Sequence, residues 1–531
     1  MTRLFGIAAV VLLLTATPLW ALSSANIPLD SPLYHYLEKL AGFGLIDTDL
    51  TGIKPYSKAE GARLLLEAEG NLSRIAAGDQ VLAVSLIEHC KNLLPREISL
   101  RSDPGKAPFV DGTPLTSARV RYVWLNGQPR NYERLVHDPG GDGVFGIGSG
   151  LRPHNPYPSP VQQRGSEGTP LSENNEGVVY HQDHNASFQW GMEGYVKDWA
   201  ALFVEPLLLH TPQSDQLSLH KGYVKLGGEG LELEAGRDAA WLGLGSRGAI
   251  TLTNNARNFD LVKLSSPEPV DLGKWGLLKY LLMASRFDET NTNGEVRQPY
   301  FYAVKLSYKP AAEWEIGFNL GRQVGGPGVN NSLGDSLRGL IGGTSADNSN
   351  GLAGFELRYR APWLRNTEFY GEFSGEDTAS FWPIVESYVA GMFVPNLTRD
   401  GRNDFRFEYF WGNQILYTNG LFPEGYIYKG MPIGHSQGGA TQEFFFRYSH
   451  WFSVRSTLAL EYFLTQRGVV DRMPGQAEEQ KNAWRALWRL PVYGDWDAEL
   501  VYGWEHVNNW NLVPGEHQTN QLFKFDLSYR Y

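Results

Sequence analysis

The last ten residues, Leu522-Phe-Lys-Phe-Asp-Leu-Ser-Tyr-Arg-Tyr531, are the stretch that decides the class of fold. Side chains of a β-strand alternate between its two faces, so one face here is apolar and the other is charged or polar. Such a strand is typical of a bacterial outer-membrane barrel, which is apolar outside and wet inside. A soluble β-sandwich can end in a similar strand, so the rest of the chain has to distinguish the two. The two faces consist of Phe523, Phe525, Leu527, Tyr529 and Tyr531, and of Lys524, Asp526, Ser528 and Arg530.

The N-terminus has the pattern of a secretory signal peptide, expected over residues 1–21. Arg3 precedes an apolar run from Leu4 to Leu14, and Pro18 is followed by a cleavage site expected near Ala21 or after Ala25. This run is too short for a membrane helix, and no later stretch approaches the ~20 apolar residues that such a helix needs. The sequence therefore predicts an exported protein without a helical anchor.

The composition limits the classes of function. The 531 residues carry a net charge of −11, which argues against nucleic acid as a partner. The lone Cys90 excludes an intramolecular disulfide and a cysteine metal cluster, and His181 and His184 are interpreted as solvated loop residues rather than metal ligands. A hydrophobic content of 42% with 13% aromatic residues suits a transmembrane barrel, because half of each strand faces water and aromatic girdles mark its interfaces.

Residues 26–95 have a helical period and predict a small helical bundle. A helix is expected over residues 33–42, where apolar residues recur at helical spacing before a glycine. Ser57 with Glu60 three residues later forms the pattern of a capping box for a second helix. A third helix is expected over 80–93, before a proline. We place this bundle on the periplasmic side, as a candidate plug of a barrel.

From about Ala118 to the end of the chain the period becomes two, which predicts β-strands. Leu231 and Leu233, for example, alternate with Glu232 and Glu234. About eighteen such segments follow one another, most of roughly ten residues, which is the length of a tilted membrane strand. The predicted fold is an all-β transmembrane barrel of antiparallel strands over residues 118–531, with a small N-terminal α-helical domain.

The connections between the predicted strands alternate in length. If the first strand runs outward from a periplasmic helical domain, the even-numbered connections lie in the periplasm and are short, whereas the odd-numbered ones are mostly longer. A soluble sandwich has no reason for this asymmetry. Keeping the alternation requires a strand at 258–266. The long outer connections are expected at 126–185, 239–257, 288–297, 324–350, 414–440 and 467–480.

The stretch Gly434-His-Ser-Gln-Gly438 matches the G-x-S-x-G nucleophile elbow of serine hydrolases. That elbow requires a turn between a strand and a helix, with an acid and a histidine further along the chain. Here the following residues alternate as a strand, and His450, His506 and His517 are scattered over loops and strand ends. We therefore expect no enzyme, although a hydrolase would make Ser436 essential.

Aromatic residues occur together with amide and acidic residues in the predicted outer loops. A flat ring can contact the apolar face of a sugar while amides and carboxylates replace water on its hydroxyls. An aromatic girdle also explains aromatics near strand ends, but it does not explain the neighbouring Asn residues; surface loops, however, are rich in Asn anyway. Examples are Trp241 with Asn254 and Asn255, Glu376 and Asp377 beside Trp382, Tyr417 with Tyr426 and Tyr428, and Trp510 with Asn508, Asn509 and Asn511.

Three segments resemble the Wzi-type capsule-assembly proteins of Gram-negative outer membranes. Residues 236–265 (GRDAAWLGLGSRGAITLTNNARNFDLVKLS) are similar to the Trp-Gly loop of the family and its Asn-Asn-Ala-Arg segment. Residues 371–383 (GEFSGEDTASFWP) resemble its acidic stretch, and residues 426–439 (YIYKGMPIGHSQGG) its Tyr-rich loop. The helical unit and the strand count also match. One departure is Trp241-Leu-Gly-Leu-Gly245, where the family usually has Trp-Gly-Pro-Gly.

The resemblance implies a non-enzymatic outer-membrane lectin that helps to attach or assemble capsular or extracellular polysaccharide at the cell surface. Its helical bundle would close the barrel from the periplasmic side. Outer-membrane lipid would surround the barrel, and the polysaccharide-export machinery is a candidate partner. No cofactor or metal is implied. The residues then expected to bind polysaccharide are Trp241, Asn254, Asn255, Arg257, Glu376, Asp377, Tyr426, Tyr428 and His435.

The alternative function is that of an outer-membrane porin for small solutes with a cell-wall-associated helical domain. A wide barrel with a polar lumen conducts unless it is plugged. Residues 26–95 distinguish the two functions, because they either fill the lumen or lie beside it. The periodicity of the sequence does not say which.

Overall fold

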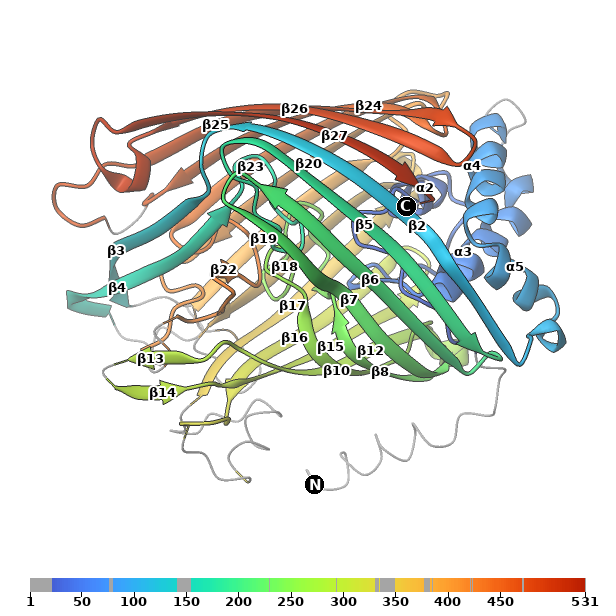
Figure 1. Cartoon of the computed structure of the whole chain (residues 1–531), viewed down its shortest axis with the longest axis horizontal. Coiled ribbons are helices and arrows are strands. Elements are labelled where there is room, and N and C mark those ends of the chain that lie inside the picture. The colour runs from blue at the N-terminus through green and yellow to red at the C-terminus, as the bar shows by residue number, and fades with distance from the viewer. Residues whose placement is uncertain are drawn as a thin grey trace.

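The computed structural model describes residues 22–530, apart from 76–79, 141–153, 229, 293, 330–333, 335–348, 377–382, 384, 421, 423, 470 and 471. The predicted signal peptide, residues 1–21, and the terminal Tyr531 lie outside the described residues. Antiparallel strands make up most of the described chain, and the α-helices lie in its N-terminal part (Figure 1).

The strands form one closed antiparallel barrel of 18 strands. Neighbours in the barrel follow one another along the chain, and the last strand pairs with the first from Ala118 opposite Tyr529 to Asn126 opposite Gln521. The strands are β2 (Val110–Asn126), β5 (Asp183–Val196), β6 (Ala200–Thr211), β7 (Ser214–Gly228), β8 (Leu231–Asp238), β10 (Phe259–Ser265), β12 (Leu277–Arg286), β15 (Tyr300–Ala311), β16 (Trp314–Val324), β17 (Ser349–Ala361), β18 (Thr367–Glu376), β19 (Val385–Val394), β20 (Asn403–Gly412), β23 (Thr441–Ser453), β24 (Ser456–Arg467), β25 (Glu479–Tyr493), β26 (Trp496–Asn508) and β27 (His517–Tyr529).

The predicted strand count and the alternation of connections are confirmed. The strand required at 258–266 is present as β10, which pairs with β8 and β12. Short strands form separate two-stranded pairs or, in one case, extend the wall. The separate pairs are β1 (Ile53–Lys54) with β9 (Trp241–Leu242), β3 (Arg130–Gly140) with β4 (His154–Gly168), β13 (Thr290–Thr292) with β14 (Glu295–Arg297), and β21 (Ile427–Tyr428) with β22 (Met431–Pro432), and the extension is β11 (Val270–Asp271) with β12.

The two faces of the wall differ as the period of two predicts. Outward side chains such as Leu202 and Trp484 are 46% and 54% exposed, whereas the inward Lys305 and Glu356 are buried and form an ion pair. On the last strand, Asp526 accepts hydrogen bonds from Arg121 at 2.6 and 2.8 Å, and both side chains are buried. The apolar face of the barrel is therefore its outer surface.

Exposed aromatic side chains recur at the connections of one end of the barrel. Each lies at or beside a different strand end, so together they surround this end like the interfacial girdle of a membrane barrel. They are Phe109, Trp199, Trp275, Trp363, Phe452 and Tyr493.

The helical domain packs against this same end, here called the helical end (Figure 1). Its core includes Leu37, Leu64 and Cys90 and continues into Trp451 of β23. The hydroxyl of Ser57 accepts a hydrogen bond from the Glu60 N–H at 3.0 Å, which confirms the predicted cap. No helix within the described residues is long and apolar enough to span a membrane. The α-helices are α2 (Leu33–Gly42), α3 (Lys58–Gly70), α4 (Gln80–Leu93) and α5 (Pro95–Ser102), with short 3-10 turns η1 (Leu72–Arg74) and η2 (Pro104–Lys106).

The helical domain is fixed to the inside of the barrel by buried polar contacts. The Asp49 carboxylate accepts hydrogen bonds from Arg358 and Arg360, both at 2.8 Å, and lies 3.2 Å from the Lys309 ammonium. The Asn26 amide donates to Asp238 at 2.7 Å. These partners all belong to barrel strands, so the segment that joins the helices enters the lumen.

Candidate functional site

Some of the connections at the opposite end, here called the loop end, also fold into the lumen. The hairpins β3–β4 and β13–β14 extend from this end, away from the helices (Figure 1). Two other loops, residues 239–258 and the described part of 413–440, share one hydrophobic core with inward side chains of the wall. We call these two loops together the loop plug. Its core contains Leu242, Ile250, Leu252, Tyr417, Tyr426, Tyr428 and Ile433, with Phe259 and Phe301 from the wall.

Two glutamates of the wall hold loop 239–258 by its backbone. Glu372 of β18 accepts hydrogen bonds from the N–H groups of Gly245 at 2.7 Å and Ile250 at 3.0 Å. Glu408 of β20 accepts from the N–H groups of residues 246–248 at 2.7, 3.0 and 3.3 Å. A buried loop without regular structure must satisfy its polar backbone groups, and these carboxylates do so.

Tyr417 connects the two loops of the plug. Its hydroxyl donates to the Ile250 carbonyl at 2.5 Å and accepts from the His435 N–H at 2.7 Å. The His435 ring stacks on Phe410 at a centroid distance of 3.6 Å. Burial, assisted by the nearby Arg247, holds the pKa of His435 well below its ordinary value, so the ring is neutral at physiological pH.

Buried charges fix the long hairpin β3–β4 to the wall. Arg130 and Arg134 of β3 both contact Glu167 of β4, and Arg467 of β24 lies 3.0 Å from the same carboxylate. Arg467 also pairs with Glu479 of β25. The hairpin base is therefore anchored to the wall through buried ion pairs.

Most of the described residues that were predicted to bind polysaccharide belong to the loop plug and lie inside it. Trp241, Asn254, Asn255, Glu376, Tyr426, Tyr428 and His435 are buried, whereas Arg257 is exposed and Asp377 lies outside the described residues.

Contacts within the protein occupy several of these buried groups. The Trp241 ring lies 5.7 Å from the Lys54 ammonium, the Asn255 amide donates to the Pro432 carbonyl at 3.0 Å, and Glu376 accepts from the Tyr417 N–H.

Ser436, the nucleophile of the G-x-S-x-G match, is also buried. It lies in the connection before β23, and the Gln437 amide donates to its hydroxyl at 3.2 Å. The segment that follows is a strand, as the sequence predicted, and not the helix that a nucleophile elbow requires.

Sequence reasoning did not single out the residues that hold the plug, namely Glu372, Glu408, Ile53 and Lys54. The signal for Glu372 and Glu408 is their inward position on predicted strands, but many charged residues share that position.

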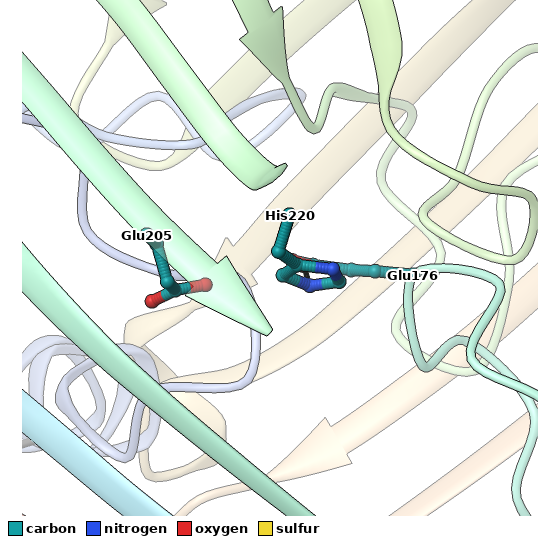
Figure 2. A group of neighbouring side chains, drawn as sticks. All are labelled: Glu176, Glu205 and His220. Carbon is teal, nitrogen blue, oxygen red and sulfur yellow. Dashed lines mark hydrogen bonds and ion pairs between the residues drawn. The ribbon is translucent and has the colours of Figure 1, made fainter. Parts of the chain in front are cut away.

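One buried cluster has the composition of a metal site. Glu176, Glu205 of β6 and His220 of β7 offer ligand atoms within 4.8 Å of one another (Figure 2). The Lys221 ammonium, however, lies 2.7 Å from Glu176 and 3.9 Å from Glu205, and the His220 Nε2 contacts Glu176. A lysine in this position supplies the positive charge that a metal would bring, so we assign no metal to the cluster.

A cavity of about 400 Å³ lies in the lumen between the helical domain and the loop plug. Its wall includes Tyr34 and Lys54 from the helical domain and Trp241 and Ser246 from the plug. Charged side chains of the barrel also line it, and several are paired: Arg406 with Glu38, Arg485 with Glu461 and Arg489 with Glu499.

These features together define an outer-membrane β-barrel whose lumen is occupied from both ends. A family model extends this assignment: the chain belongs to the capsule assembly protein Wzi family, whose model matches residues 152–522.

Among solved structures, the chain is similar to Wzi from Escherichia coli, a carbohydrate-binding outer-membrane barrel involved in group 1 capsule assembly. The TM-score is 0.63 at 16% identity, and the match covers 95% of this chain and 98% of that one, which shows the shared fold. Pseudomonas aeruginosa OprD and OpdQ match with TM-scores of 0.40 and 0.43 at 9% and 10% identity, covering 80% and 79% of this chain and 97% of each of theirs. A comparison with curated protein sequences finds no significant match.

Proposed function

We propose that this protein is a non-enzymatic outer-membrane lectin that holds capsular or other extracellular polysaccharide on the cell surface. The observation that carries the proposal is the structure of the loop end in a member of a capsule-assembly family: two of its loops are held together by one buried core that they share with the wall. The E. coli relative, a carbohydrate-binding barrel, supports the same function. A polymer that makes many weak contacts with such a surface is retained without one tight site, because each contact raises the effective concentration for the next.

We assign the predicted binding residues to two roles. Arg257, which is exposed, and Asp377 are proposed to contact the polymer directly. The buried residues are proposed to act as positioning residues that hold the loops in shape. Tyr428 illustrates this role, because its ring stacks on Phe259 at 4.4 Å while the neighbouring Lys429 is exposed and pairs with Asp288.

In this proposal the helical domain lies on the periplasmic side, where the polysaccharide-export machinery is a candidate partner, and the apolar outer face meets membrane lipid. The porin alternative is weaker, since both the helical domain and the loop plug occupy the lumen. A conducting pore would need both of them to leave the lumen.

The test compares the partition of surface polysaccharide between cells and medium in the parent strain, a deletion strain, and strains with single substitutions. We expect polymer to be made but released into the medium in the deletion strain. Arg257→Glu should release part of it, whereas Arg399→Glu, the same change at an exposed position of the helical end, should not. Unchanged partition in the deletion strain together with reduced uptake of small solutes would show instead that the barrel is a pore.

A further inference from the structure

A segment of the helical domain reaches the loop plug through the lumen. Residues 49–54, here called the lumen segment, leave the helices between α2 and α3 and end in strand β1. β1 pairs with β9 of loop 239–258, with Ile53 opposite Leu242 and Lys54 opposite Trp241. The Gly243 N–H also donates to the Gly52 carbonyl at 3.0 Å. Parts of the chain that enter the barrel from opposite ends therefore form one small sheet.

The wall holds the lumen segment in place. Glu315 of β16 accepts hydrogen bonds from the N–H groups of Thr51 and Gly52, both at 3.0 Å. Asp49 is bound by Arg358 and Arg360 of β17. The position of β1 is therefore defined by the barrel and not only by its contact with the loop.

Side chains add a second connection between the two ends. Ile53 is buried in the core of the loop plug. The Lys54 ammonium lies 5.7 Å from the Tyr34 ring of α2 and 5.7 Å from the Trp241 ring of β9. A cation at this distance attracts both ring faces, so Lys54 joins an aromatic residue of the helical domain to one of the loop.

Hydrogen bonds continue this path to the second loop of the plug. The Leu242 N–H donates to the Leu252 carbonyl at 2.9 Å, and the Thr253 N–H donates to the Ile433 carbonyl at 2.7 Å. Each step is a backbone contact between buried residues. If β1 moves, the backbone groups of β9 must move with it or lose their hydrogen-bond partners. A buried backbone group without a partner destabilises the fold, so the displacement is passed on to the loop plug.

We propose that the lumen segment couples the two ends of the barrel, so that the helical domain controls the conformation of the loop plug. A partner that moves the helical domain would then change the surface presented at the other end. Coupling is reciprocal, so a ligand bound at the loop end would equally stabilise the helical domain. This inference goes beyond polysaccharide binding and does not depend on it.

The test displaces the lumen segment and measures the loop plug, in the full-length protein without any ligand. A Cβ added at Gly52 would lie 2.9 Å from the Ser307 hydroxyl and 3.2 Å from the Glu315 and Glu356 carboxylates, whereas one at Gly70 meets nothing within 4 Å. Hydrogen exchange followed by mass spectrometry should show the amides of 242–252 and 426–437 exchanging about tenfold faster or more in Gly52→Val. Gly70→Val, the matched control, should match the parent protein.

The barrel itself provides the internal reference. Strands β24 to β27 should exchange as in the parent protein, which would show that Gly52→Val is assembled. If the amides of 45–57 exchange faster while those of the loop plug do not change, the coupling is refuted.

A disulfide between β1 and β9 provides a second test, which does not depend on whether Gly52→Val assembles. Directly opposed residues of an antiparallel pair have Cβ atoms ~4.5–5.5 Å apart, close to the separation that a disulfide spans after small adjustment. Ile53→Cys with Leu242→Cys, in a Cys90→Ala background, should therefore cross-link on oxidation. With Asp49→Asn as the displacing change, the oxidised form should keep the loop protected and the reduced form should lose protection. Equal exchange in both forms would contradict the proposal.

Discussion

Removing the Glu408 carboxylate should release loop 239–258 from the wall without unfolding the barrel. This carboxylate accepts the N–H groups of residues 246–248 and the Tyr370 hydroxyl, which donates at 2.8 Å. Glu408→Ala leaves these donors without their acceptor at a buried position. Those donors that water in the neighbouring cavity does not reach regain a partner only when the loop opens.

The size of the effect follows from the number of bonds lost. Hydrogen bonds to a charged acceptor contribute about 1.5 kcal/mol each at the low end of the range, so the backbone donors alone amount to roughly 4.5 kcal/mol. Ser246 borders the 400 Å³ cavity, so hydrogen bonds to water in the cavity recover part of the lost stabilisation. We expect a net loss of about 3 kcal/mol in local stability, which corresponds to about a hundredfold increase in the population of the open loop.

Hydrogen exchange measured by mass spectrometry gives the local opening directly. Amides of 243–252 should exchange about a hundredfold faster in Glu408→Ala, while strand amides should not change. Glu408→Gln keeps one carbonyl acceptor and should have a smaller effect. The matched control is Glu499→Ala, since Glu499 pairs with Arg489 and Lys524 of the wall. If Glu408→Ala and Glu499→Ala affected the loop equally, the argument that Glu408 holds it would be wrong.

Three further predictions concern the helical domain. Asp49→Asn removes the charge that binds Arg358, Arg360 and Lys309, so docking of the helical domain should weaken by about 3–5 kcal/mol in proteolysis or thermal unfolding. Burial alone would raise the pKa of Asp49, but these three cations hold it well below its ordinary value of 3.8. The carboxylate therefore contributes its full stabilisation above about pH 4, and this stabilisation is lost as the pH falls through the pKa of the folded state. An acid titration that follows the protection of the helical domain from proteolysis would check this. Ser57→Ala removes the cap of α3 and should lower the stability of the helical domain by about 1 kcal/mol, measured by denaturant unfolding; an unchanged stability would contradict the role of the cap.

The barrel was predictable because its strands obey a simple rule. A wall that is apolar outside and polar inside imposes a period of two on most strands. The short strand β10 departs from it, with Phe259 and Leu261 inward and Asp260 outward, and was predictable only from the alternation of connection lengths. The helices were predictable from their caps and spacing, with one exception. Pro95, expected to follow the third helix, also begins α5, because a proline is tolerated in the first turn of a helix.

The arrangement of the loops was not predictable in the same way. The period of a strand shows where the strand ends but not whether the following loop turns outward or into the lumen. Rings and amides serve a glycan site, but they also serve a buried loop, where Asn255 satisfies a carbonyl of another loop. The composition therefore identified residues of the loop plug, such as Trp241 and Tyr426. It did not predict that they are buried, because their burial depends on partners far away in the sequence.

A wide barrel whose lumen is filled from both ends raises the question of why the wall has so many strands. Transport does not explain it, since the described lumen holds the helical segment, the loop plug and a cavity bordered by paired charges. A larger strand number gives a wider loop end, and each added hairpin contributes another outer connection to it. Retention of a polymer depends on how many contacts one molecule makes at once. A broad and rigid surface favours this more than a deep pocket does, because rigid loops lose little entropy on binding. The width of the barrel is then explained by the area of the surface it supports, and the plugs by the need to keep that surface rigid and the membrane closed.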